Sequence, residues 1–363
     1  MFSPKGRDKR ASLGSPTKER RLGREHRPSR RMFEVVEPLQ DAPKGEDAEV
    51  KRARRERITW TVELAQKFLL NSTEALRELA TAGIAHWRIP NEDRNLLHAI
   101  FGGDAHVPNA LASNMALRIN AGHGLINALL EVQRRRPTWR WYSFTFIDGS
   151  IRTKDRSTII DLKRFEKSVR RLMSNAGLKD WVGVIEFLPY KNWEKGKGRD
   201  LAPHMHIVLT REKRLARSKL EIKMRSSGRL EAFQEAPTVT ITERANTEGD
   251  VAHAAQYLLK GPDRAANAFR GRNGKPTQRD ARQRNDQAVR VMEILSQFNL
   301  SELIKSSGKS GKKVRSELVA VIRNAARASK AGAPIARSDV SEIWRRARQA
   351  AGKAQYDPVT IIR

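Results

Sequence analysis

The stretch Pro203-His204-Met205-His206-Ile207-Val208-Leu209-Thr210 decides the fold of the central part of the chain. Its apolar, β-branched composition predicts a β-strand, in which successive side chains point to opposite faces of a sheet. His204 and His206 therefore share one face, and Met205 and Ile207 share the other. Two imidazoles side by side on one strand are a ready pair of metal ligands. Two polar residues that merely face solvent on a strand give the same pattern, because so short a motif often arises by chance.

An acidic residue lies on the run that precedes this strand. Trp181 to Leu188 is apolar and rich in β-formers, and the polar, glycine-containing loop from Pro189 to Ala202 follows it, so a β-hairpin is predicted. The loop is longer than the commonest hairpin connections, so the sequence does not fix the register. If the strands pair, Glu186 can lie across from the histidines. One carboxylate and two imidazoles suit Mg²⁺ or Mn²⁺, with Zn²⁺ as an alternative. Glu186 could equally be a surface residue that pairs with lysines of the loop.

A tyrosine lies on a short predicted helix further along the chain. Asp250 to Lys260 has an acidic start and an alanine-rich body, and a Gly-Pro pair follows it. Tyr257 and Lys260 are three residues apart and share a helix face. A tyrosine hydroxyl, with a pKa of about 10, needs a nearby ammonium and a metal-polarised phosphate to attack phosphorus. The structural alternatives are packing of Tyr257 on the sheet and stabilisation of the helix end by Lys260. His253, one turn before Tyr257, is a further ligand, a base or an ordinary histidine.

Together these motifs resemble the HUH endonucleases, and specifically the single-tyrosine rolling-circle replication initiators. Members of that family carry an apolar, threonine-containing strand, then a His-hydrophobic-His strand, then a helix with a Tyr-x-x-Lys pattern. Trp141 to Asp148 resembles the first motif, and all three occur here in that order over roughly residues 139–263. The resemblance implies a site-specific single-strand DNA nickase. Such an enzyme forms a 5′-phosphotyrosine intermediate and frees a 3′-hydroxyl for rolling-circle DNA replication.

The resemblance also implies a role for each matching position. Tyr257 would be the nucleophile, Lys260 would bind or orient the scissile phosphate, and Thr145 would help to position DNA. A divalent metal, Mg²⁺ or Mn²⁺, would be held by Glu186, His204 and His206. The long hairpin loop departs from the family pattern and weakens the third-ligand assignment. The single tyrosine on the helix favours the single-tyrosine subgroup over two-tyrosine initiators of the phage type.

The composition of the chain agrees with a nucleic-acid partner. Its 71 Lys and Arg residues outnumber its 41 Asp and Glu residues, which gives a formal net charge of +30 over 363 residues. Such a field attracts polyanions and speeds association with DNA. The absence of cysteine excludes disulfide scaffolds, thiolate zinc sites and cysteine catalysis. No run approaches the roughly 18 apolar residues that span a bilayer, and the basic N-terminus lacks the apolar core of a signal peptide. We therefore expect a soluble, cytoplasmic protein with no membrane partner.

Two glycine-lysine pairs, Gly274-Lys275 and Gly308-Lys309, lack the upstream glycine of a P-loop. We therefore expect no ATP site and no helicase activity in this chain. The expected partners are origin DNA, single-stranded or in a hairpin, together with a host helicase and polymerase.

The sequence divides into four parts. Residues 1–57 are basic and nearly free of periodic apolar positions, which predicts a disordered basic arm. Residues 58–137 carry apolar residues at helical spacing and predict a helical region. Residues 138–263 would form the HUH endonuclease domain that the resemblance implies, with the order strand, helix, strand, strand, strand, helix. Residues 264–363 form a basic helical C-terminal region, in which Ser306 to Lys313 is expected to be a flexible linker. The expected fold class is α+β, a mainly antiparallel sheet with packed helices of the ferredoxin-like or RNA-recognition type.

Three other functions stay open at this point. A conjugative relaxase or a single-tyrosine transposase uses the same chemistry. Relaxases usually place the tyrosine before the histidines, whereas here it follows them, and such transposases are typically compact, whereas this chain has long flanking helical regions. A non-catalytic DNA-binding protein on the same fold is the alternative from a different class.

Overall fold

The computed structural model describes residues 59–103, 109–151, 159–190, 201–232, 236–270, 276–327, 335, 337–352 and 360–362. These residues belong to one compact unit of the chain. The expected basic arm, residues 1–57, lies outside them, and so does most of the loop between Glu186 and His204. None of the described helices combines the length and the apolar character needed to cross a membrane.

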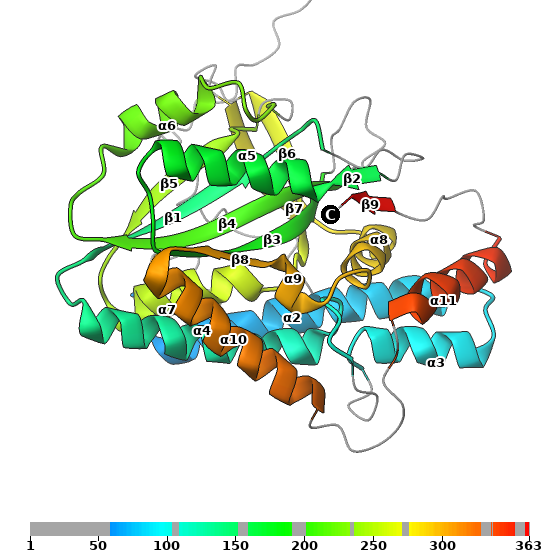
Figure 1. Ribbon diagram of the computed structural model, residues 1–363. Coiled ribbons are helices and arrows are strands. Elements are labelled where there is room, and N and C mark those ends of the chain that lie inside the picture. The colour runs from blue at the N-terminus through cyan, green and yellow to red at the C-terminus, as the bar shows by residue number, and fades with distance from the viewer. Residues whose placement is uncertain are drawn as a thin grey trace, which may run out of the picture. The chain divides into compact units, whose positions relative to one another are not determined.

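A five-stranded antiparallel sheet lies at the centre of the fold (Figure 1). Its strands, in spatial order, are β5 (Val239–Arg244), β1 (Arg140–Ile147), β4 (Leu201–Arg211), β3 (Trp181–Pro189) and β8 (Ile304–Ser307). Each strand runs antiparallel to its neighbours. The predicted α+β class with a mainly antiparallel sheet is therefore confirmed.

Four of these strands follow a ferredoxin-like course. With α5 (Leu162–Asn175) and α6 (Arg217–Arg225), the chain runs β1-α5-β3-β4-α6-β5, which is the β-α-β-β-α-β order of that fold. Both helices lie on one face of the sheet (Figure 1). The Tyr142 hydroxyl of β1 accepts a hydrogen bond from the backbone N–H of Leu215, just before α6, at 3.1 Å. Arg170 of α5 lies over the Trp181 ring of β3, 5.4 Å from its centroid.

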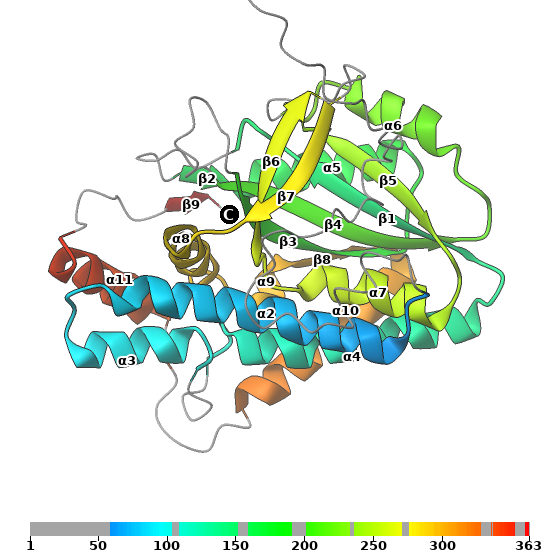
Figure 2. The ribbon, with the colours of Figure 1, turned by 180° about the vertical axis from the view of Figure 1, so that it is seen from behind.

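The opposite face of the sheet packs against helices that flank these strands in the sequence. They are α2 (Val62–Ala85), α4 (Met115–Arg135) and α7 (Glu248–Leu259), and Figure 2 shows them running together below the sheet. Arg136, which follows α4, donates to the Thr210 hydroxyl at 3.4 Å. Thr210 lies on the same strand face as His206, because the two positions are four residues apart on β4. The helices α4 and α7 therefore approach the face that carries the histidines.

Two expectations for the C-terminal third of the chain were wrong. Residues 264–282, the first part of the region expected to be helical, instead contain the hairpin of β6 (Arg264–Arg270) and β7 (Pro276–Arg282). The expected linker, Ser306 to Lys313, is instead the end of β8 and the start of α10 (Gly308–Arg327). The short run at β8 is ordered by the free edge of β3, with which it pairs, and by the Asp180 carboxylate, which accepts from the Ser310 N–H at 2.9 Å. A four-residue edge strand depends on such tertiary partners and has almost no signal of its own.

The remaining elements complete the flanks of the fold. They are α3 (Asn91–Ile100), α8 (Asn285–Leu295), α9 (Leu300–Leu303), α11 (Arg337–Ala350), and the parallel pair β2 (Ile159–Asp161) and β9 (Thr360–Ile362). The C-terminal region, which the sequence predicts to be basic and helical, thus contains the helices α8, α9, α10 and α11.

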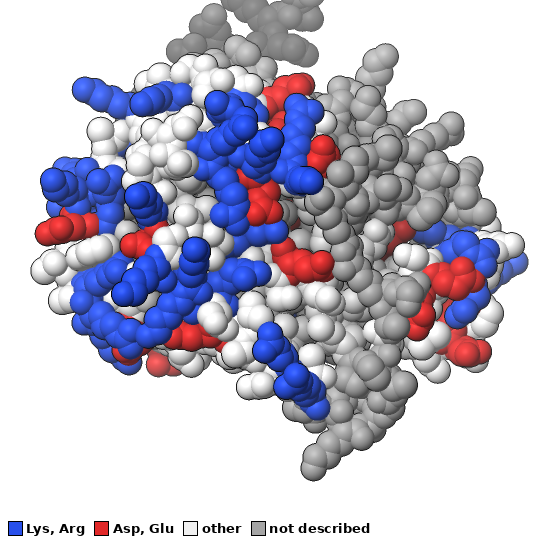
Figure 3. Space-filling view, in the orientation of Figure 1, with Lys and Arg blue, Asp and Glu red and all other residues white. Residues whose placement is uncertain are grey.

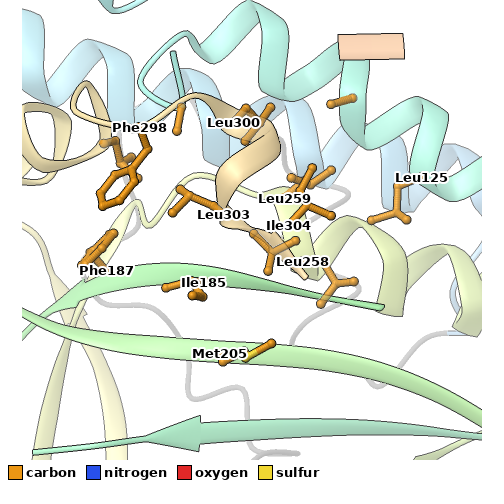
Figure 4. Close-up of a cluster of buried hydrophobic side chains, with 14 of the residues drawn as sticks. Leu125, Ile185, Phe187, Met205, Leu258, Leu259, Phe298, Leu300, Leu303 and Ile304 are labelled. Atoms are coloured by element: carbon orange, nitrogen blue, oxygen red, sulfur yellow. The ribbon is translucent and has the colours of Figure 1, made fainter. Parts of the chain in front are cut away.

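A continuous hydrophobic core joins the sheet to the flanking helices. Figure 4 shows Leu258 and Leu259 of α7 in one cluster with Ile185 of β3 and Met205 of β4. All four side chains are at most 3% exposed. Each such burial stabilises the fold by roughly 1.5–3 kcal/mol. Leu258 and Leu259, which directly follow the tyrosine, therefore anchor α7 in the core that joins the sheet to the helices.

Gly249 sets how closely the start of α7 approaches the chain that enters α2. A Cβ atom at this position would overlap the backbone carbonyl of Trp60. We expect Gly249→Ala to lower the free energy of unfolding by about 1–3 kcal/mol, because backbone cannot move aside as a side chain can. Urea denaturation would measure the loss. Gly124→Ala is the matched control, because its Cβ would meet only the Val321 side chain, at 3.2 Å. Equal stability of the two variants would contradict this close approach.

Candidate active site

The strand register brings the predicted site residues together. Glu186 of β3 lies directly opposite His204 of β4, and Thr145 of β1 lies directly opposite His206. Directly opposed residues project to the same face of a sheet. The hairpin predicted from the sequence is confirmed, and its register, which the sequence left open, places the carboxylate across from the histidine pair.

A chain of hydrogen bonds links these side chains. His206 Nε2 lies 3.0 Å from Glu186 Oε2, and His206 Nδ1 lies 3.1 Å from the Thr145 hydroxyl oxygen. A carboxylate only accepts, so in this arrangement Nε2 carries the proton, and in the neutral ring Nδ1 accepts from the threonine. Thr145 thus orients the His206 ring, which is a role other than the predicted contact with DNA.

The site is buried and strongly polarised. Glu186, His204 and His206 are 5%, 2% and 7% exposed. Burial acts to raise the pKa of the Glu186 carboxyl, but the His206 hydrogen bond and the Lys260 charge outweigh it and lower the pKa to about 2. Burial, with the nearby positive groups, lowers the pKa of His204 to about 3. At neutral pH the site therefore presents an ionised carboxylate beside a neutral imidazole.

Tyr257 reaches this network from α7. Its ring meets the His206 ring edge-to-face, with 5.1 Å between the centroids. Lys260 Nζ lies 4.6 Å from the centroid of the Tyr257 ring. The helix ends at Leu259, so Lys260 is its C-cap and not part of its last turn, yet the ammonium remains beside the tyrosine. The predicted nucleophile, its predicted ammonium partner and the histidine pair thus lie together.

His253 lies one turn before Tyr257 on α7 and contacts the Tyr257 ring and the Trp60 ring. Its ring stacks on Trp60 with 3.7 Å between centroids and 6° between the planes. The His253 and Tyr257 rings are 6.4 Å apart and nearly perpendicular. Of the roles left open for His253, these contacts favour an ordinary histidine that packs between Trp60 and Tyr257.

The donor set fits a divalent metal in part. Two neighbouring ligands of an octahedral ion with bonds near 2.1 Å lie about 3 Å apart, and His206 Nε2 and Glu186 Oε2 are 3.0 Å apart. The second oxygen of Glu186, Oε1, is buried without a hydrogen-bond partner. His204 Nε2, however, is 2.9 Å from the Tyr190 hydroxyl. Within the part of the chain that the structure describes, no three His, Asp or Glu side chains surround a common point. His204 would have to release Tyr190 to bind a metal ion through Nε2.

Sequence reasoning missed two residues at this site, Tyr190 and Arg118. Tyr190 is 1% exposed, and burial raises the pKa of its hydroxyl, so the hydroxyl stays protonated beside His204. The signal was available, because Tyr190 lies four residues after Glu186 and so has the same strand parity.

Arg118 of α4 is the more unusual of the two. It is 1% exposed, and its guanidinium donates to the carbonyls of Ala112 at 2.6 Å and Leu259 at 3.4 Å. Burial lowers its pKa to about 10, while the negative charge of Glu186 opposes that shift, so the side chain is charged at neutral pH. The available signal was its position on the apolar stripe of its helix, in register with Ala121 and Leu125.

Comparison with known proteins adds no further constraint on this site. No model of a known protein family matches the chain, and no curated protein or solved structure gives a significant match.

Proposed function

We propose that the chain is a metal-dependent single-strand DNA nickase of the HUH type that initiates rolling-circle replication. The observation that carries the proposal is the meeting of Tyr257 with His206, which in turn contacts Glu186, at a site with Lys260 beside the tyrosine. A tyrosine that only packs on the sheet, or a histidine pair that only faces solvent, does not require a buried, ionised carboxylate beside it. Perturbed titratable groups gathered around a possible nucleophile are typical of catalytic sites.

Each residue of the site has its own role in the proposed strand cleavage. The Tyr257 oxygen attacks the scissile phosphorus, the bond from phosphorus to the 3′ oxygen breaks, and the tyrosine proton ends on the released 3′-hydroxyl. The 5′ phosphate stays bonded to the enzyme. Lys260 places a positive charge where the phosphate and the developing phenolate meet. Attack by the 3′-hydroxyl on the same phosphorus reverses the reaction, so rejoining needs no ATP.

Glu186, His206 and His204 would hold the metal ion. A Mg²⁺ or Mn²⁺ ion supplies polarisation of the scissile phosphate and neutralises its charge. The buried surroundings exclude water and strengthen these electrostatic effects. Thr145 fixes the orientation of the His206 ring, as the outer partners of ligating histidines commonly do.

Glu186→Gln tests this ligand set without an activity assay. We expect the variant to bind Mn²⁺ about 10–100-fold more weakly, because it loses an anionic ligand. Isothermal titration calorimetry on the full chain measures the affinity. Glu243→Gln, the same change on β5 of the same sheet, serves as the control and should leave the affinity unchanged. Equal affinity of the wild type and the Glu186 variant would remove Glu186 from the ligand set.

A covalent-adduct assay tests the proposed reaction. The full chain is mixed with a pool of random-sequence single-stranded oligonucleotides and Mn²⁺, then separated on a denaturing gel. We expect a protein band shifted by attached DNA, which EDTA prevents. If DNA binds but no adduct forms with Mg²⁺, Mn²⁺ or Zn²⁺, the chain is a non-catalytic DNA-binding protein.

A further inference from the structure

A strongly basic surface lies on the side of the molecule where α5, β8 and α10 meet. Lys and Arg side chains gather over this region in Figure 3, with few acidic side chains between them. The α5 helix carries five basic residues and one acidic residue, and α10 carries six basic residues and one acidic residue. Lys305 Nζ pairs with Glu166 at 2.6 Å, and Arg170 donates to the Ser306 carbonyl at 3.1 Å, so the three elements form one connected surface.

The part of this surface formed by β8 and α10 is hollowed. A cavity of about 240 Å³ lies between β8 and α10, lined by Ser306, Lys312, Arg315, Ser316, Val319, Ala320 and Arg323. Arg315 is held in place there, because its guanidinium donates to the Ile304 carbonyl at 2.9 Å and to the Ser301 carbonyl at 3.4 Å. Lys312 and Arg323 are exposed, and no described carboxylate pairs with either. The hollow thus combines hydroxyl donors with two cations that are available to a ligand.

The spacing along α10 matches an extended polyanion. From Lys312 to Arg323 the helix rises about 16 Å at 1.5 Å per residue. One strand of B-DNA advances 3.4 Å per phosphate along its axis, so this stretch faces about five phosphates. A small anion would need only one of the two positions.

The composition of the surface favours a double strand over a single strand. Proteins that bind single-stranded DNA offer aromatic rings on which bases stack. No aromatic residue occurs in α10 or β8, and Phe165, the aromatic residue of α5, is fully buried. The surface therefore offers hydroxyl, Lys and Arg side chains, which contact the phosphate backbone. Such contacts position a duplex without reading its bases.

We propose that the surface formed by α5, β8 and α10 binds the phosphate backbone of duplex DNA. This second site deepens the proposed nickase function, because β8 is the edge strand beside β3, which carries Glu186, and α10 packs against α4 on the side of the histidine face. The duplex next to a nick site would be held there while the single strand enters the face that carries Tyr257. Binding to this surface does not depend on cleavage, so the two proposals can fail separately.

The test compares two charge-matched double variants of the full chain. Lys312→Glu with Arg323→Glu changes the proposed surface, and Lys219→Glu with Lys223→Glu changes two exposed lysines on α6 by the same total charge. Fluorescence anisotropy measures the affinity for a 20-base-pair duplex of arbitrary sequence and for a 20-base single strand over a range of salt concentrations. Lys312→Ala with Arg323→Ala repeats the test without introducing carboxylates.

We expect the first variant to lose at least tenfold in duplex affinity and its salt slope to fall by about two, since each lost phosphate contact contributes about 0.9. The α6 variant should change duplex affinity less than threefold, and the alanine pair should lie between the wild type and the first variant. Equal losses for the α10 and α6 variants, or equal losses for duplex and single strand, would overturn the proposal. An absent covalent adduct together with the expected duplex result would reject the nickase and keep the duplex surface.

Discussion

Tyr257→Phe is expected to lower the rate of covalent DNA cleavage by at least about 10³-fold, as removal of a nucleophile does in other enzymes. The phenylalanine ring keeps the edge-to-face contact with His206 and the position beside Lys260, so only the hydroxyl oxygen is lost. The structure of the site and its affinity for a single strand should therefore persist.

Single-turnover cleavage of a labelled oligonucleotide, with anisotropy for binding, separates the two effects. Tyr142→Phe is the matched control, because it removes a buried tyrosine hydroxyl from the opposite face of the sheet, where that hydroxyl contacts Leu215. We expect its cleavage rate to stay within about threefold of the wild type, because its hydroxyl contributes only local stability, on the order of 1 kcal/mol. Cleavage by Tyr257→Phe at the wild-type rate would assign the nucleophile to another residue.

Arg118→Met is expected to lower the free energy of unfolding by about 3–5 kcal/mol, the range for removing one partner of a buried charged network. The variant leaves the carbonyls of Ala112 and Leu259 without their donor, and it leaves the buried Glu186 carboxylate with less compensating charge. The Leu259 carbonyl belongs to the last residue of α7, directly before Lys260. Loss of Arg118 should therefore also loosen the turn that places Lys260 beside Tyr257.

Urea denaturation measures this loss. Arg134→Met is the control on the same helix, because Arg134 is 64% exposed and its nearest carboxylate is 3.6 Å away. We expect the control to change stability by less than about 0.5 kcal/mol, as is usual for surface positions. Arg118→Lys, which keeps the charge but has fewer donors, should fall between the two. A loss for Arg118→Met as small as that of Arg134→Met would contradict the role of the buried guanidinium.

The sequence predicted those elements whose own residue pattern matches the structure that they adopt in the folded protein. The alternation around His204 and His206 and the apolar run before Glu186 predicted β4 and β3 within a few residues, and the Gly-Pro stop predicted the end of α7. Both strands are buried on both faces, so their composition left little choice of structure.

The remainder depended on partners far away in the sequence. The strand β8 forms because β3 offers a free edge, and its residues, Ile-Lys-Ser-Ser, resemble a loop when taken alone. The position of Arg118 on the apolar stripe of α4 indicates burial, but its partner, the Leu259 carbonyl, lies 141 residues later and could not be identified from the sequence. The register of Glu186 against His204 was likewise undecided, because a long loop joins the two strands.

Peptide mapping of the protein-DNA adduct tests the central claim most directly. The full chain is reacted with single-stranded DNA and Mn²⁺, digested with nuclease and protease, and analysed by tandem mass spectrometry. The account predicts a 5′-phosphonucleotide on Tyr257, in the peptide that continues into Lys260. A nucleotide attached to any other residue, or cleaved DNA without an attached nucleotide, would contradict it.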